Sequence, residues 1–343
     1  MAEQLEIVRD VAAVVGLAEG ERGVRSVIAA VVRLEPVSTR RLSRTVDLPV
    51  PIVASVCGEL RKRSVVAAER PTQLTPRGRA LFAGGGLDVE RPATCPKCSG
   101  RGVIVRAEMR PLLAEMRRIA RLAPPPRPDL DQCHCTAETK LRRVLALHEA
   151  DALVGRRVLI LGDDDLTSLA IDRVVRRFGS AASISHLAVV DIDPAVVGHV
   201  ARELADASFP TVSVQHDVRE PLPRSLSGCF DTVVTDPPYT VAGAALFLSR
   251  AVEALAGTGG DVFFSFGSRR PGAAYLVQQA ISEMGFAIVR LLRDFNEYVG
   301  AGVLGGTSSL YHLSAATALR PAVSGSYAGP LYTADPEQLS ASV

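Results

Sequence analysis

Between about residue 155 and residue 315, the chain alternates short apolar runs with longer segments of helical periodicity. The apolar runs predict strands at 157–161, 187–190, 211–215, 232–235, 261–266, 287–292 and near 309–313. The segments between them predict helices at 167–178, 194–207, 241–256 and 273–284. Alternation of this kind is typical of a parallel, doubly wound α/β sheet, which binds ligands at the carboxyl ends of its strands. We therefore expect functional residues directly after the strands.

Acidic residues follow the first four predicted strands. They are Asp163, Asp164 and Asp165 after the first strand, Asp191 and Asp193 after the second, Asp217 after the third and Asp236 after the fourth. In nucleoside-binding sheets, the acid that ends the second strand accepts hydrogen bonds from the ribose hydroxyls, as Asp191 would here. Asp217 is placed to receive an adenine amino group, and Asp193 also suits a helix N-cap before Pro194. The pattern indicates a Rossmann-like sheet of the class I methyltransferase type.

The loop after the first strand carries a concentrated negative charge. Gly162 is followed by three acids, 163–165, and adjacent carboxylates repel one another unless a cation binds there. S-adenosylmethionine has a carboxylate of its own, which its enzymes accommodate with glycine-rich turns and free backbone amides. An acidic loop repels that carboxylate and attracts the ammonium that remains after decarboxylation. The loop therefore favours a decarboxylated donor and a cationic amine acceptor over a nucleic acid.

The fourth strand is followed by the sequence Asp236-Pro237-Pro238-Tyr239. The Asp236 carboxylate and the Pro237 carbonyl are expected to accept hydrogen bonds from an attacking nitrogen, with Tyr239 stacking on or orienting it. Displacement at a sulfonium needs positioning and a neutral amine, so Asp236 or one of the acids at 163–165 would take the proton. Amino methyltransferases acting on DNA, RNA or protein share this motif, so it does not separate methyl transfer from aminopropyl transfer.

Four of the six cysteines cluster ahead of the sheet, as Cys95-Pro-Lys-Cys98 and Cys133-His-Cys135. Two thiolates separated by two residues and followed by glycines have the form of a zinc knuckle. The four thiolates could complete a tetrahedral structural zinc site, and His134 could replace one of them. Reduced thiols or a redox pair remain the alternative.

The first 85 residues have the order of elements of a winged helix. Helices are expected at 24–34, 39–46 and 51–63, two short strands at 65–68 and 73–75, and a further helix from 76. Basic residues at 40, 41, 44 and 61–63 could contact phosphate. Dimerisation or packing is the favoured role, because phosphate attraction usually needs a stronger positive face.

The catalytic half of the sequence resembles the branched-chain polyamine synthases, or N(4)-bis(aminopropyl)spermidine synthases, from about residue 90 to 315. The resemblance rests on Gly162-Asp-Asp-Asp-Leu-Thr-Ser168, Asp191-Ile-Asp193, Asp236-Pro-Pro238, Asn296-Glu297-Tyr298, Asp131-Gln132 and the Cys95–Cys98 segment. It implies a homodimer with an N-terminal winged helix and a Rossmann-like catalytic domain. It also implies transfer of aminopropyl groups from decarboxylated S-adenosylmethionine to the secondary nitrogen of spermidine, with release of methylthioadenosine.

The resemblance also assigns roles to individual residues. The acids at 163–165 would bind the amine or accept its proton, Asp191 would bind ribose, and Asp236 would orient the nucleophile. Asp131, Gln132, Tyr239, Glu297 and Tyr298 would line the polyamine side, and Gly162, Asp193, Asp217 and Pro237 would complete the donor site. The expected domains are a winged helix at 1–85, a linker with the cysteine-rich segment at 86–140, the Rossmann-like domain at 141–319 and a mobile tail at 320–343.

Composition limits the alternatives. The 343 residues carry 39 Lys and Arg against 37 Asp and Glu, a net charge of +2, which argues against a generic polyanion binder. With no membrane-spanning stretch and no basic leader, we expect a cytoplasmic protein. Two other functions stay open: an S-adenosylmethionine-dependent amino methyltransferase acting on nucleic acid, and a winged-helix regulator that senses a nucleoside or polyamine.

Overall fold

The computed structural model describes residues 2–82, 95, 97, 98, 100–179, 183–267, 271–300 and 306–333. The chain divides into two compact units, one of residues 1–94 with 301–307 and one of residues 95–300 with 308–343. None of the helices in these ranges is long and apolar enough to cross a membrane.

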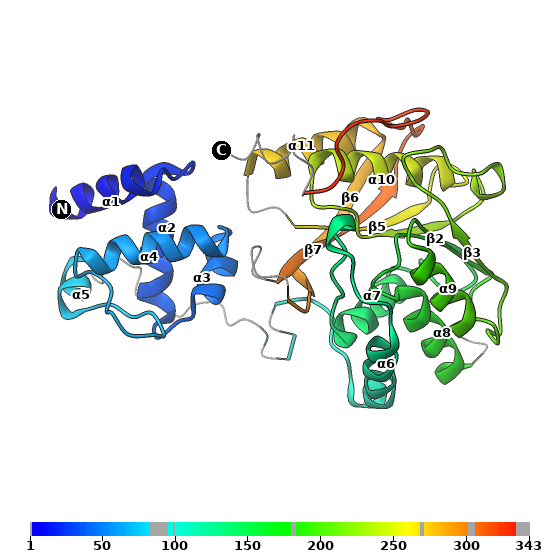
Figure 1. Ribbon diagram of the computed structural model, residues 1–343, viewed down its shortest axis with the longest axis horizontal. Helices are drawn as coiled ribbons and strands as arrows, with labels where there is room; N and C mark the ends of the chain where they lie inside the picture. The colour runs from blue at the N-terminus through cyan, green and yellow to red at the C-terminus, as the bar shows by residue number, and fades with distance from the viewer. Residues whose placement is uncertain are drawn as a thin grey trace. The chain divides into compact units, whose positions relative to one another are not determined.

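The N-terminal unit is helical (Figure 1). Its helices are α1 (Ala2–Val15), α2 (Gly20–Leu34), α3 (Thr39–Val46), α4 (Val50–Lys62) and α5 (Pro76–Phe82). Ser38 caps α3 by accepting a hydrogen bond from the Arg41 amide, and Asp47 ends it in the left-handed conformation. Where two short strands were expected, the structure has the single antiparallel bridges Val37–Thr72 and Val66–Leu74. The helices expected at 39–46 and 51–63 are present to within one residue.

The second unit is built on a seven-stranded sheet in the order β3-β2-β1-β4-β5-β7-β6. Its strands are β1 (Arg157–Leu161), β2 (His186–Asp191), β3 (Thr211–Gln215), β4 (Thr232–Thr235), β5 (Asp261–Phe266), β6 (Phe286–Glu297) and β7 (Thr307–Ala315). The first five run parallel, as predicted. The expectation of a wholly parallel sheet is wrong, because β7 runs antiparallel to β5. Only residues 298–306 separate β6 from β7, fewer than the dozen or more that a crossover between parallel strands requires.

Helices cover both faces of this sheet (Figure 1). They are α6 (Arg110–Leu122), α7 (Ala137–Glu149), α8 (Thr167–Phe178), α9 (Pro194–Glu203), α10 (Val241–Ala254) and α11 (Pro271–Glu283), with 3-10 turns at Ala107–Met109, Pro128–Leu130 and Arg224–Leu226. One apolar core joins α6–α9 to Val158 and Ile160, and a second joins α10 and α11 to Leu159 and Leu161. Alternate β1 side chains thus enter opposite cores, as a strand buried on both faces requires.

Two segments differ from the expected domain boundaries. The expected linker at 86–140 includes α6 and the start of α7, which pack in the same core as β1. The expected mobile tail includes residues 320–333, which lie against α10: Arg250 donates to the Gly325 carbonyl at 2.7 Å and Thr240 donates to the Leu331 carbonyl at 2.9 Å. Leu331 is completely buried. The remainder of the expected tail, 334–343, lies outside the described residues.

Candidate active site

The acidic loop turns directly out of β1. Gly162 has a φ of +77°, in the left-handed region that favours glycine, and its amide donates to the Val190 carbonyl of β2 at 2.8 Å. The Asp163 amide donates to Asp191 Oδ2, also at 2.8 Å. The carboxyl ends of β1 and β2 therefore bring the first two acidic sequences together.

Asp163 is used inside the loop. Its Oδ1 accepts from the amides of Thr167 and Ser168 at 2.7 and 3.3 Å, and its Oδ2 accepts from the Ser168 hydroxyl, so it satisfies the first turn of α8. Complete burial raises the pKa of Asp163 to about 7, although these hydrogen bonds oppose the increase. This carboxylate is committed to the fold rather than free for a ligand.

Asp165 is neutralised by the protein's own cations. Arg143 Nη1 lies 2.7 Å from Asp165 Oδ2, Lys140 Nζ lies 3.9 Å from Asp165 Oδ1, and the Cys135 amide donates to Oδ1. Burial alone would raise the pKa of Asp165, but Arg143, Lys140 and the hydrogen bond lower it to about 2. The cation that relieves repulsion within the loop is thus supplied by α7.

Asp164 differs from its two neighbours because it is half-buried and faces no basic side chain at bonding distance within the described ranges. Its Oδ2 accepts a hydrogen bond of 3.2 Å from the Cys133 amide. Burial raises the pKa of Asp164 well above its usual value, and the charges of Asp165, Asp191 and Asp236 add to this increase. Asp164 is therefore the carboxylate of the loop that a ligand cation can pair with.

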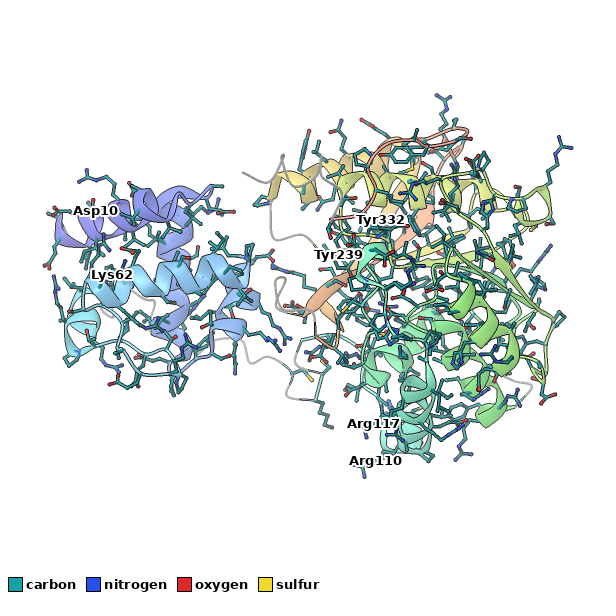
Figure 2. The ribbon with its side chains drawn as sticks, in the orientation of Figure 1. Asp10, Lys62, Arg110, Arg117, Tyr239 and Tyr332 are labelled. Atoms are coloured by element: carbon teal, nitrogen blue, oxygen red, sulfur yellow. The ribbon has the colours of Figure 1, made fainter. Side chains whose placement is uncertain are left out.

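Asp236 is enclosed by hydrogen-bond donors. Tyr239 donates to its Oδ1 at 2.9 Å, and Tyr298 and Arg143 donate to its Oδ2 at 2.6 and 2.5 Å. The two tyrosine hydroxyls also lie 2.6 Å apart, and Tyr239 is among the side chains labelled in Figure 2. Burial raises the pKa of Asp236 to about 6, with Arg143 opposing the increase. The carboxylate orients two hydroxyls, and Pro237 beside it is buried.

The acids after β2 and β3 hold backbone amides. Asp191 Oδ1 accepts from the Asp193 amide at 2.8 Å, while Asp193 caps α9 through the Ala195 amide at 2.8 Å. The N-cap alternative for Asp193 is therefore the one the structure supports. Asp217 is turned towards its own loop, accepting from the Arg219 amide at 2.9 Å.

The segment that contains Cys133 and Cys135 contacts the acidic loop through its backbone amides. Besides its amide bonds to Asp164 and Asp165, it pairs with the end of β6: the Thr136 amide donates to the Glu297 carbonyl at 2.7 Å, and the Val299 amide donates to the His134 carbonyl at 2.9 Å. The sequence predicted metal ligands here, whereas the structure uses the main chain.

The predicted zinc site with four cysteines is not supported. Among the described residues, no three His, Cys, Asp or Glu side chains are gathered as a metal site. Cys135 is 2% exposed, and burial raises its pKa far above the usual range. Cys98 receives hydrogen bonds from the backbone of Gly102 and neighbouring residues, which lower its pKa. In the second half of the predicted site, the amides of Cys133 and Cys135 bond to the acidic loop.

Thiol labelling tests this arrangement. Exposed Cys95 and its neighbour Cys98 should react first with a disulfide reagent, whereas Cys57 and Cys135 should stay unreactive until the protein unfolds, because both are buried and burial raises the pKa of Cys57 to about 11. A metal chelator should leave this order unchanged. Protection of all four clustered thiols until a chelator is added would contradict the structure.

The residues predicted to line the polyamine side are mostly engaged with the protein. Glu297 pairs with Arg101 at 2.6 Å and with Arg142 at 3.2 Å. Asp131 accepts from the amide and hydroxyl of Thr333 at 2.7 and 2.5 Å, which fastens the end of the packed tail. Gln132 accepts from the Arg127 amide at 2.8 Å and donates to Asp193 at 3.4 Å.

Two basic residues of the site, Lys140 and Arg143, were missed from the sequence. Both are buried on α7. Their spacing of three residues places them on one face of a helix, and that was the available signal. Tyr332, labelled in Figure 2, packs against Arg219, with 5.1 Å from the guanidinium carbon to the ring centre.

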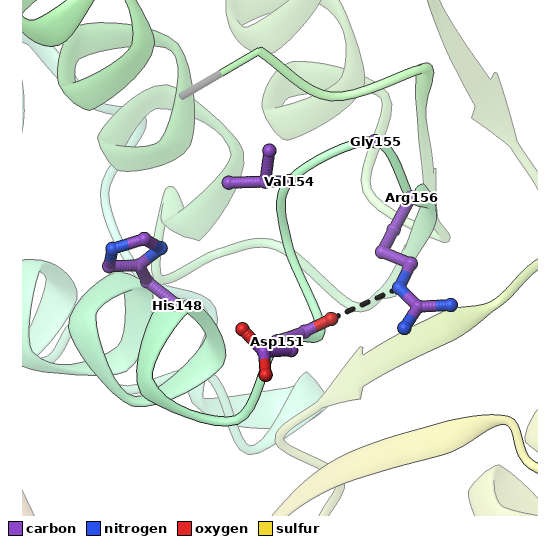
Figure 3. A pocket seen from close by; sticks show the side chains of 5 residues that line it. All are labelled: His148, Asp151, Val154, Gly155 and Arg156. Atoms are coloured by element: carbon purple, nitrogen blue, oxygen red, sulfur yellow. Dashed lines mark hydrogen bonds between the residues drawn. The ribbon is translucent and has the colours of Figure 1, made fainter. Parts of the chain in front are cut away.

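A surface hollow elsewhere does not belong to this site. It is lined by His148, Asp151, Val154, Gly155 and Arg156 (Figure 3). These residues precede β1, so the hollow lies at the opposite end of that strand from the acidic loop. Arg156 closes one side by donating to the Asp151 carbonyl at 3.0 Å.

Burial of Asp163 makes a prediction about stability. Its folded pKa of about 7 lies above the ordinary aspartate value of 3.8, so the cost of ionising it is absent below about pH 4 and fully present above pH 7. Three pKa units correspond to about 4 kcal/mol. Asp163→Asn should therefore gain stability relative to the parent as pH rises from 5 to 8, in denaturant unfolding. Parallel stability curves for the two proteins would contradict this.

Comparison with known proteins places the chain in a family. Residues 111–318 match the family described as the branched-chain polyamine synthase A C-terminal domain. An uncharacterized protein of Methanocaldococcus jannaschii is 35% identical over 90% of this chain and 77% of its own. The N(4)-bis(aminopropyl)spermidine synthase of Thermococcus kodakarensis is 32% identical over 76% of this chain and 74% of its own.

A solved structure extends the likeness to nearly the whole chain. The branched-chain polyamine synthase of Thermus thermophilus, in complex with N4-aminopropylspermidine and 5′-methylthioadenosine, superposes with a TM-score of 0.73 at 26% identity. The match covers 95% of this chain and 97% of that one. With the family match over residues 111–318, these relationships show that the chain belongs to the branched-chain polyamine synthase family.

Proposed function

We propose that this protein transfers aminopropyl groups from decarboxylated S-adenosylmethionine to the secondary amine of spermidine or a related polyamine. The observation that carries the proposal is Asp164, a half-buried acid without a basic partner among the described residues, at the edge where β1, β2 and β4 end. Relatives named N(4)-bis(aminopropyl)spermidine synthase, and the Thermus structure with its aminopropyl product and methylthioadenosine, support the same reaction.

The charge of the site favours amines even after its internal ion pairs are counted. Five acids lie at this edge, Asp163, Asp164, Asp165, Asp191 and Asp236, and two buried cations face them, Lys140 and Arg143. Burial raises the pKa of Asp163 and Asp164, so the full excess of three negative charges develops when a bound cation favours their ionised forms. Such a site attracts a polyamine and the ammonium of a decarboxylated donor, and repels the carboxylate of intact S-adenosylmethionine.

The chemistry is a displacement at carbon. The neutral secondary nitrogen attacks the aminopropyl carbon attached to sulfur, the new nitrogen–carbon bond forms, and the carbon–sulfur bond breaks with its electron pair moving to sulfur. Methylthioadenosine leaves as a neutral thioether. The proton shed by the acceptor nitrogen needs a nearby base, and Asp164 suits this role because its pKa is raised well above the usual carboxylate value.

The other residues divide into a donor side and an acceptor side. Gly162 and Asp191 form the turn and the acid that suit a nucleoside, with Asp193 and Asp217 at the neighbouring loops. Tyr239 and Tyr298 present hydroxyls oriented by Asp236 towards the acceptor. Asp131, Gln132 and Glu297 contribute through the segments they hold in place, because their side chains already bond to protein groups.

For the N-terminal unit we propose a winged helix that serves in homodimer formation. The succession of α2, α3, α4, two antiparallel bridges and α5 supports the winged-helix assignment. Val53, Val56, Cys57 and Leu60 of α4 pack in the apolar core of this unit, which supports a folded helical module. Sedimentation of the full chain with and without duplex DNA tests both parts of this proposal.

Product release tests the reaction itself. Methylthioadenosine should appear when the protein is incubated with decarboxylated S-adenosylmethionine and spermidine together, and not when either is left out. Its release should fall as ionic strength rises, because attraction of a polycation to an acidic edge is screened by salt. Release that is independent of the amine would contradict transfer to a polyamine.

A further inference from the structure

The buried Arg143 of α7 connects the ends of three strands. Its Nη1 donates to Asp165 after β1, its Nη2 donates to Asp236 after β4, and its Nε donates to Asn296 Oδ1 in β6 at 2.9 Å. Nη2 also lies 3.2 Å from the Tyr298 hydroxyl. A planar guanidinium with its donors in a fixed fork can hold these partners at once, whereas an ammonium cannot.

The surroundings of Asp236 explain why this contact matters. The groups that face it are Arg143 from α7, Asp164 and Asp165 from the loop after β1, Tyr239 from its own loop and Tyr298 from the end of β6. Lys140 lies beyond Asp165, and Cys135 lies beside Arg143. Burial and the charge of Asp165 favour the protonated form of Asp236. Among the described residues, Arg143 is the one cation in direct contact with this carboxylate, at 2.5 Å.

We propose that Arg143 is a positioning residue for the transfer reaction, which keeps Asp236 ionised and anchored so that the carboxylate can orient the Tyr239 and Tyr298 hydroxyls. Arg143 acts through Asp236 and has no contact with substrate in this role. The two tyrosines accept and donate hydrogen bonds in a defined direction only while Asp236 is an acceptor at both oxygens. A protonated Asp236 would be a donor at one of them and would break this order.

This role predicts a change in pH dependence as well as in rate. In Arg143→Lys, one ammonium cannot serve both carboxylates, and in Arg143→Gln the charge is absent. We expect kcat at pH 7.5 to fall about 10-fold for the lysine variant and about 100-fold for the glutamine variant, with KM for the polyamine changed by less than about threefold. The acidic limb of the rate profile should move to higher pH by about one unit or more, in the same order.

Two controls separate positioning from folding. Arg173 of α8 is another buried arginine, and it forms ion pairs with Asp172 and Glu203. Arg173→Gln should lower the unfolding temperature without moving the acidic limb of the pH–rate profile. If Arg143→Gln does not fold, Arg143→Lys in an Asp236→Asn background decides the question. In the Asp236→Asn background, Arg143→Lys should lower kcat little further and should not move the acidic limb of the pH–rate profile, because residue 236 no longer carries a charge.

The result that would overturn the proposal is a folded Arg143 variant whose acidic limb coincides with that of the parent. An equal loss of kcat from Arg143→Lys with and without Asp236→Asn would also overturn it. The inference rests on the proposed function for its rate measurement, and the two fail differently. An inactive parent protein contradicts aminopropyl transfer. An active parent whose Arg143 variants keep the parent's acidic limb in the pH–rate profile contradicts the role of Arg143.

Discussion

Replacing Asp164 by asparagine is expected to lower kcat/KM for aminopropyl transfer about 1,000-fold, which corresponds to roughly 4 kcal/mol. The variant keeps an oxygen for the Cys133 amide, so the loop should retain its shape. What it loses is the charge of the one acid in the loop that has no basic partner within the described ranges, and the group suited to take the proton. Removing one partner of a desolvated, charge-assisted contact typically costs 2–5 kcal/mol.

Asp206→Asn is the matched control, because Asp206 is an exposed acid shortly after α9 and the charge change is the same. Its kcat/KM should stay within about twofold of the parent, as is usual for surface substitutions. Initial rates of methylthioadenosine release across a range of spermidine concentrations measure both variants. An Asp164→Asn protein as active as the control would remove Asp164 from the mechanism.

Asp236→Asn is expected to slow transfer about 100-fold while the nucleoside product still binds within about threefold of its parent affinity. Asparagine offers one oxygen, and its amide group would face donors from Tyr239, Tyr298 or Arg143, so the order of the hydroxyls is lost. The donor side, near Asp191, is left untouched. Single-turnover rates and calorimetric binding of methylthioadenosine separate the two effects.

Asp231→Asn controls for a change on the same strand, since Asp231 immediately precedes β4 at its other end and accepts from the Arg157 amide at 2.8 Å. It should leave the rate of transfer close to that of the parent. Loss of methylthioadenosine binding in Asp236→Asn, in step with the loss of rate, would mean that Asp236 serves the donor rather than the acceptor.

Much of the fold could be predicted because the sheet is buried on both faces. Continuous apolar runs such as 157–161 and 261–266 mark its strands. Acidic residues directly after the first four strands mark their carboxyl ends. The direction of β7 could not be read in this way, because an apolar run carries no information on whether its neighbour is parallel. The bridges in place of strands near residues 66 and 74 likewise depend on pairing, not on local propensity.

The sequence predicted the acidic residues of the site but not the basic residues that pair with them. Asp163, Asp164 and Asp165 are adjacent in sequence, yet Asp163 caps α8, Asp164 is half-buried against the Cys133 amide and Asp165 pairs with α7. Their separate roles depend on Lys140 and Arg143, which precede β1 in the chain and meet the loop only in the folded structure. The cysteines show the same limit: Cys133 and Cys135 match a ligand pattern in sequence, but in the structure their amides hold the carboxylates of the acidic loop.

The central claim is that the acidic edge selects a donor without a carboxylate. Parallel incubations with decarboxylated and with intact S-adenosylmethionine, each with spermidine, test it most directly when the amine products are identified by mass spectrometry. We expect one or two aminopropyl additions to spermidine from the decarboxylated donor and no methylated polyamine from the intact one. Methyl transfer from intact S-adenosylmethionine, with no aminopropyl product from the other donor, would contradict the account.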